Sequence, residues 1–392
     1  MAGASPSAAQ SSEESILNPP PRELQPIGLR LGRTMLYPNL LVAGEYDSNI
    51  YAEEDDTNID RILHLLPTVR AVQDRGSWRL RGLAQAHVRR FARNSSENST
   101  AGLVEGEARF SPRERQSYRA LLAYRRLIED RGDPEARRDN TRGPRRLNAL
   151  GGELEHSREV GRWLFNGLLV ADKFDYLGRD DRVRDHLSLG GTLTAGRQIG
   201  GFTYAAITGF MNRRAFDQEF DDSGFQRDAT TFGARVGVQI TPGGLFDGSA
   251  SAGVFRFRPD DARIDPYSGL SLAANMNYRP TQRLALSLVA FRGNVATYRS
   301  GATARTDTRV ALRLQQEIRH NLYANAGVFY RKSEFRGSGT SQDTRGIDGE
   351  LEYLVSRRIG VTAWARAARR TSDLETEDFG RFRSGLGLRF RL

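Results

Sequence analysis

Apolar and polar residues alternate with a period of two along most of the chain from Leu36 onward. One such segment sets Trp78, Leu80, Gly82, Ala84, Ala86 and Val88 against Arg79, Arg81, Leu83, Gln85, His87 and Arg89. The same split recurs over residues 270–279 and 322–331. Because successive side chains of a strand point to opposite faces, the pattern predicts strands with one apolar and one hydrated face.

The lengths of the predicted strands and of their connections favour a membrane barrel over a soluble sandwich. The predicted strands are about ten residues long or longer, which suits a tilted crossing of a bilayer. Strands of soluble sheets usually have about five or six residues. Tight turns are expected at 73–77, 197–201, 241–245 and 320–321, and longer loops at 49–58, 129–145, 215–227, 332–344 and 371–379. Short periplasmic turns and long external loops are typical of bacterial outer-membrane barrels.

Segmentation at these connections gives about eighteen strands, an even number that returns the C-terminus to the periplasm. Their predicted starts are Leu36, Asn58, Ser77, Thr100, Gln116, Arg145, Arg162, Arg182, Phe202, Ala229, Leu245, Asp265, Gln282, Thr306, Asn321, Thr344, Ile359 and Phe379. The predicted fold is therefore all-β, a transmembrane antiparallel up-and-down β-barrel over residues 35–392 whose C-terminal strand ends at Leu392. Residues 1–34 are expected to be a signal-peptide remnant, with small residues over Ala2–Gln10, and a flexible periplasmic lead-in.

The last predicted strand carries the most specific single signal. Its apolar positions resemble the C-terminal assembly signal of outer-membrane barrels, and they are Leu386, Leu388, Phe390 and Leu392. That signal usually ends in phenylalanine, whereas this chain ends in leucine. The resemblance implies recognition by the barrel-assembly machinery. The opposite face of the strand would turn four arginines into the lumen.

Composition and charge exclude two other classes of protein. The hydrophobic fraction is 38% and the mean hydropathy is −0.56, and no stretch of eighteen apolar residues occurs, which argues against a helical membrane span. A net charge of +10 is typical of nucleic-acid binders, but here the basic residues recur along the chain instead of forming one patch. No nucleic-acid partner is expected. Only two of the 58 basic residues are lysine, Lys173 and Lys332.

The inward positions of the predicted strands are rich in arginine, which binds carboxylate, sulfate and phosphate in a bidentate manner. The candidate pore-lining residues are Arg79, Arg81, Arg89, Arg119, Arg125, Arg309, Arg313, Arg366, Arg381, Arg383, Arg389 and Arg391. A pore lined in this way would favour anions. Inward acids could instead pair with these arginines and neutralise the wall, and they are Glu105, Glu107, Glu153, Glu155, Asp348, Glu350 and Glu352.

No metal, cofactor or catalytic residue is expected from the sequence. The acidic clusters Glu53–Asp56 and Asp217, Glu219, Asp221 and Asp222 lack the spacing of a calcium loop and are better interpreted as solvated loop acids. Five histidines are scattered, with no cysteine to complete a zinc site, and no Gly-x-Ser-x-Gly motif occurs. A barrel enzyme that assembles its site from separate strands stays open as an alternative.

Three blocks near the start of the chain resemble a known family. Gly44–Tyr51 and Asp60–Arg70 are similar to the opening hairpin of the putative β-barrel porin 2 family, and Phe91–Thr100 fits the same family. The resemblance implies the outer membrane of a Gram-negative bacterium, contact with its lipids and lipopolysaccharide, and an association with exopolysaccharide production and periplasmic polysaccharide-export components.

The expected function is therefore a porin-like channel, for either exopolysaccharide export or passive solute diffusion. Two alternatives remain. One is a plugged barrel that acts as a scaffold or surface receptor, and the other is a barrel enzyme that modifies lipid or glycan.

Overall fold

The computed structural model describes residues 17, 20–55, 57–222, 224–299 and 301–392, so the signal-like residues Ala2–Gln10 lie outside the described part. The strands are β1 (Leu29–Leu31), β2 (Thr34–Asp47), β3 (Asp60–Arg75), β4 (Trp78–Phe91), β5 (Ser99–Arg113), β6 (Gln116–Ile128), β7 (Arg146–Val160), β8 (Trp163–Tyr176), β9 (His186–Gly200), β10 (Thr203–Phe216), β11 (Ala229–Ile240), β12 (Phe246–Pro259), β13 (Tyr267–Thr281), β14 (Leu284–Val295), β15 (Ala304–Arg319), β16 (Leu322–Arg336), β17 (Thr340–Leu354), β18 (Ile359–Ser372) and β19 (Phe379–Arg391). Short 3-10 helices occur at η1 (Arg22–Leu24), η2 (Ser95–Glu97), η3 (Arg179–Arg184) and η4 (Glu375–Glu377). None of the described helices is long and apolar enough to cross a membrane.

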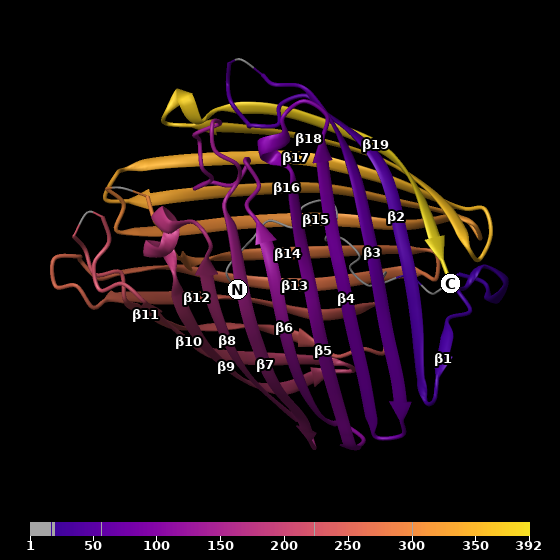
Figure 1. Ribbon diagram of the computed structural model, residues 1–392. Helices are drawn as coiled ribbons and strands as arrows, with labels where there is room; N and C mark the ends of the chain where they lie inside the picture. The colour runs from indigo at the N-terminus through magenta and orange to yellow at the C-terminus, as the bar shows by residue number, and fades with distance from the viewer. Residues whose placement is uncertain (1–16, 18–19, 56, 223, 300) are drawn as a thin grey trace.

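Strands β2 to β19 form one closed antiparallel barrel. Each strand pairs with the next in the chain, and β19 pairs with β2 to complete the ring. Figure 1 shows this closure, with yellow β19 beside indigo β2. The short strand β1 adds a hairpin onto β2. The predicted barrel of about eighteen strands is confirmed.

The predicted strand starts agree closely with the structure, and β6, β11, β18 and β19 begin at the predicted residues. The largest differences are at β9 and β17. The helix η3 precedes β9, which begins at His186 and not at the predicted Arg182, and β17 begins at Thr340 and not at the predicted Thr344. The expected long loop at 332–344 is wrong. Gly337 and Gly339, with φ of 94° and 67°, allow a three-residue turn that a β-carbon would strain.

The last strand also ends one residue earlier than predicted, at Arg391. The Leu392 N–H nevertheless donates to the Pro38 carbonyl at 3.1 Å, so hydrogen bonding with β2 continues to the last residue. The four apolar side chains of the predicted assembly signal are exposed, from 43% for Phe390 to 67% for Leu386.

The two ends of the barrel differ. Connections at one end are tight, as at 76–77, 161–162 and 320–321, while those at the other include 48–59, 129–145, 177–185, 217–228 and 296–303. Because outer-membrane barrels keep long loops outside the cell, we take the long-loop end as extracellular.

Alternation along the strands separates an apolar exterior from a polar interior. On β2, Gly44 and Tyr46 are exposed, whereas Glu45 and Asp47 between and beside them are 7% and 0% exposed. Asp47 pairs with Arg381 of β19, which in turn contacts a loop that starts on β6. Since a loop from β6 reaches β19 across the bore, Glu45 and Asp47 face inward and Gly44 and Tyr46 face lipid.

Candidate pore constriction

The loop between β6 and β7, residues 129–145, folds into the barrel mouth, and we call it the constriction loop. Three of its acids meet arginines of distant strands. Arg381 Nη1 of β19 lies 3.1 Å from Asp130 Oδ1, and Arg305 Nη1 of β15 lies 2.6 Å from Glu135 Oε2. Arg331 of β16 contacts Asp133 at 3.5 Å. The loop is therefore tied to the wall formed by β15, β16 and β19.

Backbone carbonyls of the constriction loop add further contacts with this wall. Arg370 of β18 donates to the Gly132 carbonyl, and Gln342 Nε2 of β17 donates to the Pro134 carbonyl at 3.2 Å. Gln342 is 1% exposed, so this contact is out of solvent. Every strand from β15 to β19 thus holds the constriction loop through at least one side chain.

The internal shape of the constriction loop depends on Arg131, which is 7% exposed. Its guanidinium pairs with Glu97 of η2 at 2.5 Å and donates to the carbonyls of Arg137, Asp139 and Arg142 at 2.5–3.3 Å. A planar group with five N–H donors can hold several acceptors in a fixed arrangement. Arg131 therefore organises the turn that presents the acids to the wall.

A second segment, the loop 296–303 between β14 and β15, packs against the constriction loop. Glu135 accepts hydrogen bonds from the Thr297 hydroxyl at 2.6 Å and from the Tyr298 N–H at 2.8 Å. Arg299 pairs with Glu377 of η4 at 2.8 Å. The inward segments therefore support one another as well as the wall.

Asp130 is ionised in this setting. Burial alone would raise the pKa of its carboxyl, but the guanidinium groups of Arg381 and Arg383 outweigh burial and hold the pKa well below the usual 3.8. Because the pKa is lower in the folded than in the unfolded state, the ionised carboxylate stabilises the fold at pH values above its unfolded pKa. This stabilisation is lost only as the pH falls through the lower pKa of the folded state.

We therefore expect Asp130 to remain charged between about pH 4 and pH 8. Carbon-13 NMR of labelled aspartate should show no titration of the Asp130 carboxyl over this range, whereas an ordinary exposed aspartate begins to titrate near pH 4. A midpoint at or above the usual aspartate value would mean that the arginines do not surround this carboxyl in solution.

The predicted pore-lining arginines are mostly found in ion pairs. The pairs are Arg79 with Asp74, Arg119 with Glu107, Glu153 and Glu155, Arg125 with Asp172, Arg309 with Asp307, Arg381 with Asp47 and Asp130, Arg383 with Asp130, and Arg389 with Glu352. Arg81 and Arg313 also interact with neighbouring groups. Arg89 donates to the Ser99 hydroxyl at 3.0 Å.

Three of the predicted arginines carry buried donors without a hydrogen bond, but Arg389 Nε still lies 3.2 Å from Glu352 Oε1, so only two of them also lack an ion pair among the described residues. Arg366 Nε and Arg391 Nε and Nη2 are buried and have no hydrogen-bond partner in the part of the chain that the structure describes. An unsatisfied buried donor is costly and is usually satisfied by water, an ion or a ligand. These donors therefore require a partner such as water or a ligand.

The residues that hold the constriction loop were not singled out from the sequence. They are Asp130, Asp133 and Glu135 of the loop and Arg305, Arg331, Gln342 and Arg370 of the wall. The only available signal was a long loop with several acids, which also describes an ordinary exposed loop.

Comparison with known proteins gives the family. The sequence profile described as "Putative beta-barrel porin 2" matches residues 21–392. The chain belongs to this family. It is therefore a porin-like β-barrel channel of the bacterial outer membrane. No curated protein shows significant sequence similarity to it.

Comparison with solved structures finds several proteins with low similarity to this family member. OccK2 (OpdF) of Pseudomonas aeruginosa has 12% identity and a TM-score of 0.46 over 91% of this chain and 98% of its own. A BenF-like porin from Pseudomonas fluorescens Pf-5 has 10% identity and a TM-score of 0.45 over 91% and 99%. The siderophore receptor PirA from Pseudomonas aeruginosa has 9% identity and a TM-score of 0.44 over 91% and 80%.

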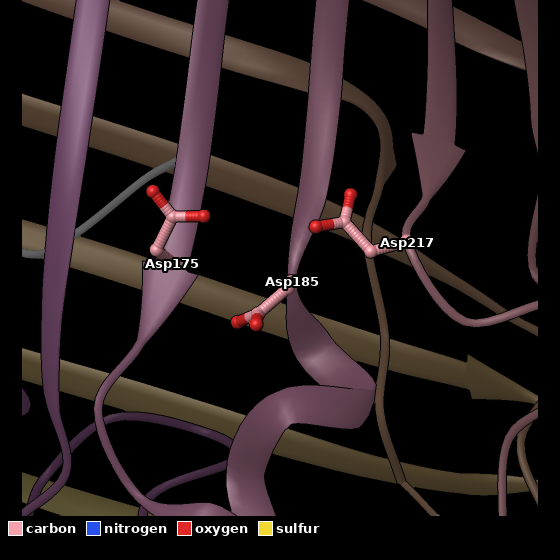
Figure 2. A group of neighbouring side chains, drawn as sticks. All are labelled: Asp175, Asp185 and Asp217. Carbon is pink, nitrogen blue, oxygen red and sulfur yellow. The ribbon is translucent and has the colours of Figure 1, made fainter.

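The geometry of one acidic group of this porin resembles a cation site. Asp175, Asp185 and Asp217 each offer an oxygen within 4.8 Å of the others, and Figure 2 shows the three side chains on neighbouring segments at the barrel rim. Lys173 Nζ lies 2.5 Å from both carboxylate oxygens of Asp217 and 3.6 Å from Asp175. A resident lysine therefore already supplies positive charge to this cluster.

Two of the other predicted loop acids also contact polar side chains of the protein. Asp221 pairs with Arg227, and Glu53 accepts a hydrogen bond from the Asn140 side chain at 3.2 Å. Asp56 lies outside the described residues.

The histidines contact one another and aromatic side chains. His64 Nδ1 lies 2.9 Å from His87 Nε2 inside the barrel. His186 contacts the Arg184 carbonyl at 2.8 Å and the Tyr298 hydroxyl at 3.2 Å. His156 stacks on Tyr118 with ring centroids 4.5 Å apart. These contacts account for four of the five histidines as structural partners.

Proposed function

We propose that the protein is a passive channel for small hydrophilic solutes and that the constriction loop sets the size limit. The observation that carries the proposal is the set of contacts between this loop and strands β15 to β19. In this proposal, water and small solutes pass beside a loop that is tied to the far wall. A fixed loop would obstruct a long polymer.

Passive diffusion is therefore favoured over exopolysaccharide export, which the family resemblance implied as an alternative. Export would require the constriction loop to release three ion pairs and the buried Gln342 contact. A plugged scaffold is the remaining alternative, and it differs from a channel in having no solute flux.

Swelling of liposomes that contain the purified protein separates these functions. We expect influx of monosaccharides, slower influx of disaccharides and none of longer oligosaccharides. Absence of influx for every sugar would support the plugged scaffold, and equal influx of long oligosaccharides would support export.

We further propose that the arginine side chains predicted from the sequence line the bore and give it a weak anion preference. Most of the arginine charge is compensated by the ion pairs described above, which stabilise the wall. The preference would then come from Arg366 and Arg391, whose buried donors lack partners among the described residues. Uncompensated guanidinium groups attract anions in a low-dielectric pore.

Replacing Arg366 by glutamine is expected to weaken this preference. In bilayers with asymmetric KCl, the reversal potential of Arg366→Gln should move by several millivolts toward the potassium equilibrium potential, since a pore charge tunes selectivity. Arg345→Gln is the matched control, because Arg345 is exposed and lies on the lipid-facing side of β17. Identical reversal potentials for Arg366→Gln and the unsubstituted protein would remove Arg366 from the selectivity determinants.

A further inference from the structure

The outer surface of the barrel carries an apolar groove with a volume of about 1180 Å³. The register places one residue from each of seven adjacent strands in a row across the groove: Ala324, Leu351, Ala363, Leu386, Gly44, Leu63 and Arg90. Their side of the wall is the lipid-facing one, since Gly44 alternates with inward Glu45. Small residues form the floor, and the leucines are 46–67% exposed. A concave apolar surface of this kind fits acyl chains.

The groove is cationic at one end. Arg90 ends the row, and Arg61 lies beside it on β3 and also lines the groove. Both side chains are exposed, and each lies one residue from the extracellular end of its strand. At this height a lipid of the outer leaflet carries its head group.

A third arginine converges on the same place. Arg90 Nη1 donates to the Ser99 carbonyl and Arg146 Nη2 donates to the Asn98 carbonyl, both at 3.4 Å. Two guanidinium groups therefore approach consecutive carbonyls at the start of β5. Like charges brought together in this way repel each other unless an anion lies between them.

These three arginines differ from several other basic residues on the same rim. Arg213 pairs with Asp260 at 2.6 Å, Lys173 with Asp217 at 2.5 Å and Arg292 with Glu334 at 3.0 Å. Within the described part of the chain, Arg61, Arg90 and Arg146 form no ion pair at 4.0 Å or less. The charge of these three rim residues is therefore compensated, whereas that of the three arginines beside the groove is not.

We propose that this surface is a binding site for lipopolysaccharide, with acyl chains in the groove and lipid phosphate groups on Arg61, Arg90 and Arg146. Guanidinium groups bind phosphate through paired charge-assisted hydrogen bonds. Lipopolysaccharide forms the outer leaflet that faces the extracellular half of the barrel, so its phosphates lie at the level of these arginines. The site is on the exterior and is independent of any solute that passes through the bore.

Native mass spectrometry of the delipidated full chain in detergent, titrated with bisphosphorylated lipid A, tests the site. The Arg61→Gln/Arg90→Gln variant should bind the lipid about tenfold more weakly, because two charge-assisted contacts are lost. The matched control is Arg256→Gln/Arg258→Gln, which removes two exposed arginines near the extracellular end of β12, outside the groove. The control should bind lipid A as the unsubstituted protein does.

A second variant tests the groove without changing charge. Gly44→Leu/Ala363→Leu fills the floor with lipid-compatible side chains, and a β-carbon at residue 44 meets nothing within 4 Å. This variant should also bind lipid A several-fold more weakly, while heat-modifiable gel migration verifies that the barrel is folded. Equal weakening in the β12 control, or no weakening in either groove variant, would overturn the proposal. Equally tight binding of dephosphorylated lipid A or of phosphatidylglycerol would also overturn it.

Discussion

Replacing Asp130, Asp133 and Glu135 by asparagine, asparagine and glutamine is expected to raise the single-channel conductance at least about twofold, because breaking the three loop-wall ion pairs frees a segment that narrows the pore. Each substitution keeps the size of the side chain and removes the charge that Arg381, Arg331 or Arg305 holds. The arginines left behind would also repel one another and line a wider, more positive bore. Planar-bilayer recording of single channels measures the effect.

The matched control for this variant is Asp139→Asn, in the same loop. Asp139 is exposed and bonds to Thr141 within the loop and not to the wall. Its conductance should equal that of the unsubstituted protein. If the triple variant also conducts like the unsubstituted protein, the constriction loop does not limit the current.

Replacing Arg131 by alanine is expected to unfold the constriction loop while leaving the barrel intact. The substitution removes three hydrogen bonds to loop carbonyls and leaves Glu97 buried without its partner. Breaking a buried ion pair by removing one member costs about 3–5 kcal/mol. The cost is local, because the strands are held by their own ladders, and local segments can open separately from the whole.

Limited proteolysis of the Arg131→Ala variant should therefore give rapid cleavage within residues 132–141 and no cleavage of the strands. Arg142→Ala is the control, since the Arg142 side chain is exposed and pairs with exposed Asp180 at 3.1 Å. Arg131→Lys should be intermediate, because lysine keeps the charge but not the planar fork. Equal cleavage of Arg131→Ala and Arg142→Ala would show that Arg131 does not organise the loop.

The sequence was sufficient to predict the barrel because the relevant signal is local. A period of two needs only neighbouring residues, and Gln116, Ala229 and Phe379 were recognised as strand starts from the turns before them. The wrong prediction of a long loop at 332–344 has an equally local cause. Polar residues around Gly337 and Gly339 resemble a long loop, yet the two glycines close a tight turn.

The ion pairs within the wall can be predicted from the sequence only in part. Arg119 and Glu155 lie directly opposite each other on β6 and β7, so their pairing follows once the register is fixed. The sequence suggested such neutralisation but could not assign partners, because a shift of one residue turns a side chain to the other face.

The inward position of the constriction loop could not be predicted from the sequence, for a different reason. Glu135 meets Arg305 and Asp130 meets Arg381 across separations of 170 and 251 residues. Nothing in the local pattern around these acids distinguishes an inward from an outward loop. Their partners are defined only when eighteen strands close into a ring and bring β15 to β19 opposite the loop.

Cross-linking of Pro134→Cys with Gln342→Cys tests the position of the constriction loop most directly, since the chain has no cysteine of its own. These residues are in contact although 208 positions apart, so a short bis-maleimide should join them in most molecules and shift their migration on a gel. Pro134→Cys with Ser341→Cys should not cross-link, because Ser341 lies on the opposite face of β17. Cross-linking of both pairs to the same extent, or of neither, would contradict a loop that lies across the bore against β15 to β19.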